Sequence, residues 1–241
     1  MSNGEFLGGL AAVLAHPDDE SFACAGALAS AHDRGAATRL LIVTRGEAGT
    51  TEDLPADEVA ELRERELICA AKVIGLDEVS LLDGYPDGGI ADQPFDALVE
   101  EIAEWLADRR PAAVITFGPH GVTGHPDHVV VGSATRWAVE RLAETGQAPN
   151  AVYVIAPVFD PAGNRYDLSG EEQGPTHRID VTEVAPRRLA ALECHASQTD
   201  AAAEIAALRA AIDTAGPIYE GFTRVRPIVP APHPVFDTRL V

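Results

Sequence analysis

The chain has little positive charge and almost no lysine. Its 241 residues include 38 acidic side chains against 18 Lys and Arg, which gives a formal net charge of −20. Lys72 is the only lysine. A surface of this sign repels the phosphates of nucleic acids and of anionic lipids. We therefore expect neither nucleic acid nor a membrane as a partner, and the simplest interpretation is that the charge serves solubility.

Cysteine is scarce too, and long apolar runs are absent. Cys24, Cys69 and Cys194 lie far apart and form no C-x-x-C pair. We expect free thiols in a reducing compartment and not a disulfide framework. The first nine residues lack the basic start and apolar core of a signal peptide. No apolar stretch approaches the roughly 20 residues that a membrane helix needs. The sequence predicts a soluble, cytoplasmic protein.

The glycine fingerprint of dinucleotide-binding domains is also missing. Short buried runs alternate with longer helical patterns, which is the rhythm of a parallel sheet covered by helices. A dinucleotide-binding domain of this class has G-x-G-x-x-G after its first strand. Here the run 10–15 is followed by HPDDE (residues 16–20), whose carboxylates would repel a pyrophosphate. We predict a single α/β domain over residues 1–241, with a Rossmann-like, mostly parallel sheet and helices on both faces, but no NAD site.

The pattern of apolar residues places the elements. Strands are predicted at residues 10–15, 38–43, 79–82, 113–117, 151–156 and 178–181. Helices are predicted at residues 21–34, 56–74, 95–108, 126–144, 184–195 and 201–215. Residues 160–176 are rich in Gly, Pro, Asn and Glu and are predicted to form a long surface loop, and the last 25 residues are predicted to be irregular.

Two His-Pro-Asp motifs are the most informative segments. HPDDE (residues 16–20) follows the first predicted strand, and GHPDH (residues 124–128) follows the fourth. Catalytic and binding groups of open α/β sheets gather at the carboxyl ends of the strands, so the two motifs can meet in one crevice. One copy alone would be explained by its proline, which presets the first turn of a helix. Two copies at two strand ends predict a shared site.

The residue types in these motifs indicate a metal. His16 and Asp19 are three residues apart, as are His125 and His128, and this spacing can put both members of a pair on one helix face. The motifs offer two or three imidazoles and up to four carboxylates. Two histidines and one carboxylate, with an open position for water, suit Zn²⁺.

At these residues the sequence resembles the LmbE-like, or PIG-L, family of N-acetylglucosaminyl deacetylases. The resemblance covers nearly the whole chain, with the motifs in the same order. They are AHPDDE (15–20), TRGEAG (44–49), RE (65–66) with A-x-x-x-G (71–75), YPDGG (85–89), GHPDH (124–128) and CHASQ (194–198). AHPDDE and GHPDH are the specific ones, and the others support them.

The resemblance implies a zinc-dependent enzyme that hydrolyses the N-acetyl amide of an N-acetylglucosamine-type conjugate. It identifies His16, Asp19 and His128 as ligands of one zinc ion per chain. Asp18 matches the general base that takes a proton from the attacking water. His125 matches the group that stabilises the oxyanion or protonates the departing amine. The implied partner is a small aminosugar conjugate, and self-association of the chain is compatible with the resemblance.

Four further residues receive expected roles. Arg45, Asp87 and His195 match segments that lie near the substrate in such enzymes. Each also has a structural interpretation: a solvated pair of Arg45 with Glu47, a turn at Asp87, and a helix-end position for His195. We expect the Asp127 carboxylate to orient His125 and to raise its pKa.

Other residues receive mainly structural expectations. Glu20 is expected either to cap or pair locally or to support the metal ligands from behind. His32, His177 and His233 are expected at the surface, and Trp105 and Trp137 are expected within helices, as packing residues. Thr123 and His120 depart from the family pattern, which leaves the oxyanion contact and the substrate range open.

Three competing functions stay open at this point. A metal-dependent amidase could act on an amide that is not a sugar derivative. A phosphoesterase could use the same loops, but such sites generally bind two metals and need a cationic or amide cradle for phosphate. A non-catalytic metal- or sugar-binding module would have no use for a base, yet Asp18 and His125 are both present.

Overall fold

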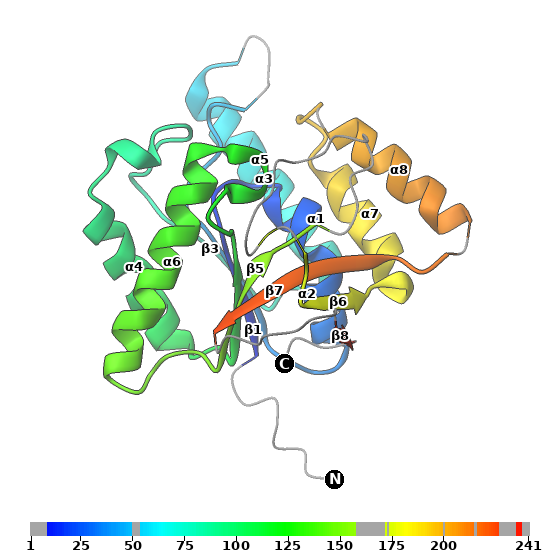
Figure 1. Cartoon of the computed structure of the whole chain (residues 1–241). Coiled ribbons are helices and arrows are strands. Elements are labelled where there is room, and N and C mark those ends of the chain that lie inside the picture. Colours follow the sequence, from blue (N-terminus) through cyan, green and yellow to red (C-terminus); the bar gives the residue numbers. More distant parts are fainter. Residues whose placement is uncertain are drawn as a thin grey trace.

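A twisted sheet of eight strands lies at the centre of the computed structural model (Figure 1), which describes residues 9–49, 54–157, 172, 174–199, 201–214, 216–226 and 235–237. The strand order is β3-β2-β1-β4-β5-β7-β6-β8. The bounds are Leu10–Leu14 (β1), Thr38–Ile42 (β2), Glu78–Leu81 (β3), Ala113–Thr116 (β4), Ala151–Ile155 (β5), His177–Asp180 (β6), Tyr219–Arg226 (β7) and Val235–Asp237 (β8).

The sheet is parallel except for one strand. Strands β3, β2, β1, β4 and β5 pair in parallel, as do β6 and β8. Only β7 runs antiparallel, between β5 and β6. The predicted Rossmann-like, mostly parallel α/β fold is therefore confirmed. The prediction of an irregular C-terminal tail is wrong, because β7 lies within it. Pro217 and Pro227 flank this strand, and the proline content of the region concealed its eight residues.

Helices cover both faces of the sheet (Figure 1). On one face α4 packs against α6, and on the other α2, α3 and α7 pack together with α8 against α7. The bounds are Asp19–Ala23 (α1), Ala25–Asp33 (α2), Ala56–Ile74 (α3), Phe95–Arg109 (α4), Gly121–Gly124 (α5), Pro126–Glu144 (α6), Ala185–Cys194 (α7) and Ala201–Asp213 (α8). Short 3₁₀ turns cover Ile90–Asp92 and Thr182–Val184. No helix in the described ranges is both long and apolar enough to cross a membrane.

One helix predicted from the sequence is divided into two helices, α1 and α2, in the structure. The pattern over residues 21–34 predicts a single helix, but the backbone breaks at Cys24, whose φ is −150°. The break allows the N–H groups of Gly26 and Ala27, at the start of α2, to donate hydrogen bonds to the buried Glu220 carboxylate, both at 2.8 Å. A helix N-terminus favours such an anion. The long-range partner on β7, and not the local sequence, sets this boundary.

Helix α6 starts at the site and packs closely on β4. Pro126 is its first residue and His125 its N-cap, as expected for a proline with preset φ. Gly132 faces the carbonyl oxygen of Phe117, and a Cβ atom there would collide with it. This close approach places the first turn of α6 directly beyond the carboxyl end of β4.

Several expectations about single side chains are corrected. Cys69 and Cys194 form a disulfide with a Cα–Cα distance of 5.8 Å, so only Cys24 is a free thiol. The two cysteines are 125 positions apart in the sequence, so no local pattern indicated this pairing. His177 is buried against Tyr153. Trp137 is 60% exposed, whereas Trp105 is buried as predicted. His233 and most of the predicted loop 160–176 lie outside the described residues.

Candidate metal centre and catalytic site

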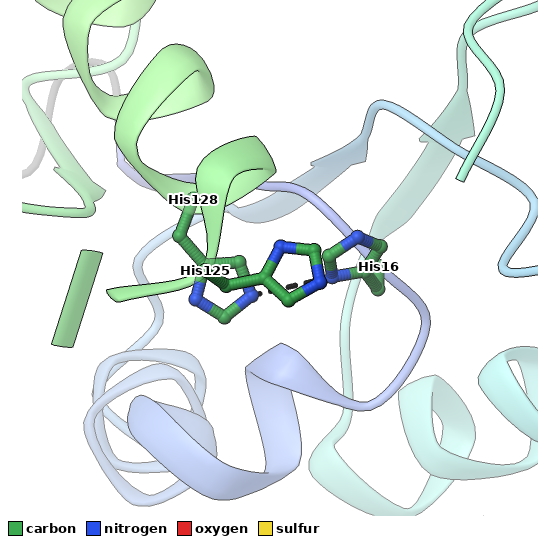
Figure 2. Close-up of side chains that lie close together, drawn as sticks. All are labelled: His16, His125 and His128. Carbon is green, nitrogen blue, oxygen red and sulfur yellow. Dashed lines mark hydrogen bonds between the residues drawn. The ribbon is translucent and has the colours of Figure 1, made fainter. Parts of the chain in front are cut away.

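The two His-Pro-Asp motifs meet at the carboxyl ends of the neighbouring strands β1 and β4. Figure 2 shows His16, His125 and His128 side by side, with a hydrogen bond between His16 and His128. The ring centroid of His125 lies 4.7 Å from that of His16 and 4.9 Å from that of His128. Together these three side chains could hold a metal ion, as could His16 with Asp87 and Asp127.

Donor atoms of His16, Asp19 and His128 lie close together, with a different oxygen of Asp19 nearest to each imidazole. His16 Nδ1 lies 3.2 Å from His128 Nε2, which in turn lies 3.2 Å from Asp19 Oδ1. His16 Nδ1 is 3.6 Å from Asp19 Oδ2. Zinc binds such atoms at roughly 2.0–2.2 Å, so tetrahedral donors lie about 3.3–3.5 Å apart. These spacings are compatible with one metal ion shared by His16, Asp19 and His128, and this ligand set stays a prediction.

The backbone fixes the Asp19 carboxylate. Its Oδ2 accepts hydrogen bonds from the N–H groups of Ala15 (3.1 Å) and His16 (2.8 Å). Burial alone would raise the pKa of Asp19, but the charges of His128 and His16 outweigh it and hold the pKa below its usual range. The carboxylate is therefore ionised and aimed at the two imidazoles.

The second ring nitrogen of His16 is held by two carboxylates. His16 Nε2 lies 3.1 Å from Asp87 Oδ1 and 3.2 Å from Asp127 Oδ2. Burial lowers the pKa of His16, but the hydrogen bonds to Asp127 and Asp87 and the charge of Asp19 raise it to about 10. Once a metal displaces the proton on Nδ1, the proton held on Nε2 by the two carboxylates gives the usual carboxylate–histidine–metal arrangement.

Asp127 thus contacts a different histidine from the one expected. Its carboxylate lies against His16, and it also accepts the N–H groups of Gly88 (2.7 Å) and Ile90 (3.2 Å). Only the backbone N–H of Asp127 reaches His125, donating to Nδ1 at 3.2 Å. The pKa of His125 is lowered by burial and by the charges of His16 and His128, in contrast to the expected rise.

A bent loop orients His128. Its Nδ1 lies 3.0 Å from the carbonyl oxygen of Gly121, so a proton on Nδ1 leaves Nε2 facing Asp19. Phe117 stacks on the ring at 4.0 Å between centroids. The loop is bent at Val122, which has φ 63°. The buried Glu172 carboxylate accepts the N–H groups of His120 (3.0 Å) and Val122 (3.1 Å) and so holds this bend.

Asp18, the neighbour of Asp19, has a separate partner in Arg63. Its backbone has φ 123° and ψ −29°, a conformation that costs a residue other than glycine about 1–3 kcal/mol. Asp18 Oδ2 accepts a hydrogen bond from Arg63 Nη2 at 2.6 Å. Burial and the nearby Asp19 charge raise the pKa of Asp18 to about 7, against the opposing effect of Arg63. A carboxylate with a pKa near the working pH suits a general base.

Arg63 is the site residue that the sequence analysis missed. It is 3% exposed and donates to the carbonyl oxygens of Pro17 and, at 3.0 Å, Gly46. A signal for it exists in the sequence. Arg63 falls on the buried face of α3 with Val59, Ala60 and Leu67, and a cation on such a face needs a buried anion.

The three residues expected near the substrate lie in different surroundings. Asp87 belongs to the cluster through His16, and its N–H donates to Glu47 at 2.9 Å. Arg45 pairs with Glu64 at 3.0 Å, with both side chains 40% exposed, so its role stays a prediction. His195 is 1% exposed and contacts Glu20. Direct substrate contact by His195 is therefore excluded in this conformation.

Comparison with known proteins agrees with this geometry. Residues 11–139 match the family model described as PIG-L: GlcNAc-PI de-N-acetylase. This segment contains both His-Pro-Asp motifs, and it is more than half of the chain. The chain belongs to the PIG-L family. The prediction of an N-deacetylase enzyme is confirmed at the level of that family.

Individual relatives match this chain over most of its length and most of their own. The chain is 30% identical over 191 residues to a probable N-acetyl-alpha-D-glucosaminyl L-malate deacetylase 2 of Bacillus anthracis, covering 77% of this chain and 79% of the relative. It is 29% identical to a 1D-myo-inositol 2-acetamido-2-deoxy-alpha-D-glucopyranoside deacetylase of Kineococcus radiotolerans, covering 86% and 74%. The structure of GalB, the 4-carboxy-2-hydroxymuconate hydratase of Pseudomonas putida KT2440, superposes with a TM-score of 0.72 at 21% identity, covering 92% and 98%. At that identity the likeness shows the fold alone.

Proposed function

We propose that this PIG-L family chain hydrolyses the N-acetyl amide of an N-acetylglucosamine conjugate and releases a free amine and acetate. The observation that carries the proposal is that two adjacent carboxylates have different partners. Asp19 lies with His16 and His128 in a cluster of metal-donor side chains, whereas Asp18 pairs with Arg63. One site therefore holds both a metal position and a separate base.

The donor set fits Zn²⁺ held by His16, Asp19 and His128. When bound, such an ion polarises the amide carbonyl and makes a water molecule more acidic. Asp87 and Asp127 hold His16 in the ring orientation and tautomer that this binding needs. These two carboxylates act through His16, and Asp127 is therefore a positioning residue in the proposed mechanism.

The protein residues would perform the proton transfers. Asp18, with its pKa raised to about 7 by burial and by Asp19, would accept a proton from the attacking water. His125 accepts the Asp127 N–H at Nδ1, which leaves Nε2 free of that contact. From there Nε2–H would donate a hydrogen bond to the developing oxyanion, whereas protonation of the departing amine would first require His125 to take up a proton at Nδ1.

The substrate class follows from the relatives. One is named for a GlcNAc-malate conjugate and another for a GlcNAc-inositol conjugate. We propose a small conjugate of this kind, with Arg45 and Asp87 among the residues that face it. An amide outside the sugar class is the alternative, and the amine-release assay below distinguishes the two. A homo-oligomer stays a prediction.

The test is amine release from a panel of N-acetylglucosamine conjugates, with zinc-loaded and chelator-treated protein side by side. We expect metal-dependent release. Asp18→Ala should keep stoichiometric zinc but lower kcat roughly 10²- to 10⁴-fold, since this is the typical contribution of a positioned base. Asp83→Ala, which removes an exposed carboxylate after β3, is the control.

Each contrary outcome has a distinct meaning. Zinc binding without amine release from any conjugate would reject the sugar amide and favour a different amide or a binding module. Phosphate release from phosphoesters would support the phosphoesterase instead. Full activity of Asp18→Ala would remove Asp18 from the mechanism.

A further inference from the structure

A buried ion pair behind the site has no part in the proton transfers described above. Glu20 Oε1 lies 2.7 Å from His195 Nε2, and neither side chain is exposed to solvent. The residues are 175 positions apart and come from the AHPDDE and CHASQ motifs. Burial of a carboxylate and an imidazole is costly unless their hydrogen bonds are satisfied. The position of this pair therefore calls for a specific role.

Glu20 joins the pair to Asp18. Its Oε2 accepts the backbone N–H of Asp18 at 3.1 Å, while Oε1 accepts the Ser21 hydroxyl at 2.6 Å as well as His195. The Asp18 carbonyl oxygen accepts the N–H groups of Ser21 (2.8 Å) and Phe22 (3.1 Å). Hydrogen bonds thus fix both the N–H group and the carbonyl group of the strained Asp18 residue, and the N–H group donates to Glu20.

The backbone turn at Asp18 separates the two adjacent carboxylates. Asp19 must face His16 and His128, and Asp18 must face elsewhere. The positive φ of Asp18 achieves this, but a residue with a Cβ atom does not hold such a φ by itself. The conformation therefore depends on the contacts around it, and the Glu20 carboxylate is the acceptor for its N–H group.

His195 is fixed in its turn by α3. It follows the last residue of α7, and the next segment is tied to Glu66, whose carboxylate accepts the Ser197 N–H at 2.8 Å and the Ser197 hydroxyl at 2.7 Å. Arg63, on the same helix, donates to the Asp18 carboxylate. Helix α3 therefore supports Asp18 twice, directly through Arg63 and indirectly through His195 and Glu20.

We propose that Glu20 and His195 form a positioning pair that holds the backbone of Asp18 in its strained conformation and so keeps its carboxylate on the reacting water. The catalytic part of this inference rests on the proposed role of Asp18 as the base. The pair touches neither the substrate nor the metal. The pair affects kcat through Asp18 alone and leaves the affinity for substrate unchanged.

The experiment compares His195→Leu, His195→Gln and Glu20→Gln with the unaltered protein. His195→Leu removes the donor to Glu20 and should lower kcat roughly 10- to 100-fold, as for other residues that orient a reacting group, with KM changed less than about twofold. His195→Gln keeps an N–H donor and should recover most of the rate. In an Asp18→Asn background, His195→Leu should cause no further loss. His177→Leu is the matched control, because His177 is also buried but lies on β6 and contacts Tyr153.

Two further measurements do not depend on turnover. The zinc-to-protein ratio of each variant should equal that of the unaltered protein. In a crystal structure of the His195→Leu variant, the φ of Asp18 should no longer be positive. In the His195→Gln variant it should stay positive. The His195→Gln variant is measured alone if the leucine variant does not fold.

The outcomes separate this inference from the proposed function. Active protein with unchanged kcat in His195→Leu would overturn the positioning pair and leave the deacetylase intact. A rise in KM alone would also overturn it, since that indicates substrate contact. Absence of amine release by the unaltered protein would reject the function, and an unchanged Asp18 backbone in His195→Leu would then reject the positioning pair on structural grounds.

Discussion

At the scale of single residues, Asp127 shows how one buried carboxylate organises the metal position. It contacts His16 Nε2 through one oxygen and the loop after β3 through both. The side chain is not exposed, so water cannot replace these contacts if they are lost. Removal of its charge should therefore be felt at the metal, although Asp127 is outside the proposed ligand set.

The expected effect of Asp127→Asn is weaker metal binding. An amide can no longer serve as a charged partner of His16 Nε2–H, and changes of this kind typically cost 10- to 100-fold in metal affinity. Competition with a chromophoric chelator measures the dissociation constant. Asp83→Asn should leave it unchanged, and equal affinities for Asp127→Asn and the unaltered protein would show that Asp87 alone orients His16.

The sequence was most informative where function depends on local spacing. His16, Asp19 and His128 could be named as proposed ligands because each lies in a short motif at a strand end, and the structure brings the three side chains together. Arg63 and the partner of Glu20 could not, because their contacts join α3, α7 and the β1 loop, which are far apart along the chain. The same reason explains the error for Asp127. Spacing placed it near His125, and only the fold showed that its carboxylate reaches His16.

At the scale of elements, helix ends with a local signal were predicted well. The bounds of α3 and α6 agree with the structure, since Gly75 ends α3 with φ 87° and Pro126 begins α6. The break at Cys24 and the strand β7 were missed, because a carboxylate from another strand and pairing with two neighbours determine them. Tertiary contacts override local preference in both places.

The start of β2 depends on a carboxylate from the loop after α3. Asp77 Oδ2 accepts the Thr38 N–H at 2.7 Å, and this hydrogen bond holds the pKa of Asp77 below its usual value. A lowered pKa in the folded state stabilises the protein above the unfolded-state pKa of about 3.9, and this contribution is lost as pH falls through the folded-state value.

Asp77→Asn should therefore destabilise the protein at neutral pH, by less than about 1 kcal/mol because the side chain is half exposed. The difference between variant and unaltered protein should shrink as the pH falls below about 4. Urea unfolding at a series of pH values measures it. A difference that is constant over this range would show that the Asp77 charge contributes nothing.

At the scale of the whole molecule, the disulfide joins two helices on one face of the sheet. Cys69 lies in α3, and Cys194 is the last residue of α7, directly before His195. Closure of a loop this long restricts the unfolded chain strongly. The expectation of a reducing compartment rested on three free thiols and loses that support.

Reduction of the disulfide should lower the free energy of unfolding by about 2–5 kcal/mol, the range for long loops. Thermal unfolding with and without a dithiol reductant measures it, with Cys69→Ala as the permanently reduced form. Cys24→Ala removes the buried free thiol and should not alter the response to reductant. If reductant shifts Cys69→Ala as much as the unaltered protein, the disulfide is not the cause.

The hydrogen bonds from Gly88 and Ile90 to Asp127 bear on how such an enzyme can acquire a new substrate. The YPDGG segment is built into the support of His16, so exchange of this loop for that of another enzyme would also alter the hold on the metal ligand. The side chains of Arg45 and Glu64 pair with each other and are 40% exposed, whereas the neighbouring Gly46 and Glu47 are hydrogen-bonded to Arg63 and Asp87. Directed evolution of specificity should therefore begin at Arg45 and Glu64 themselves and spare Gly46 and Glu47.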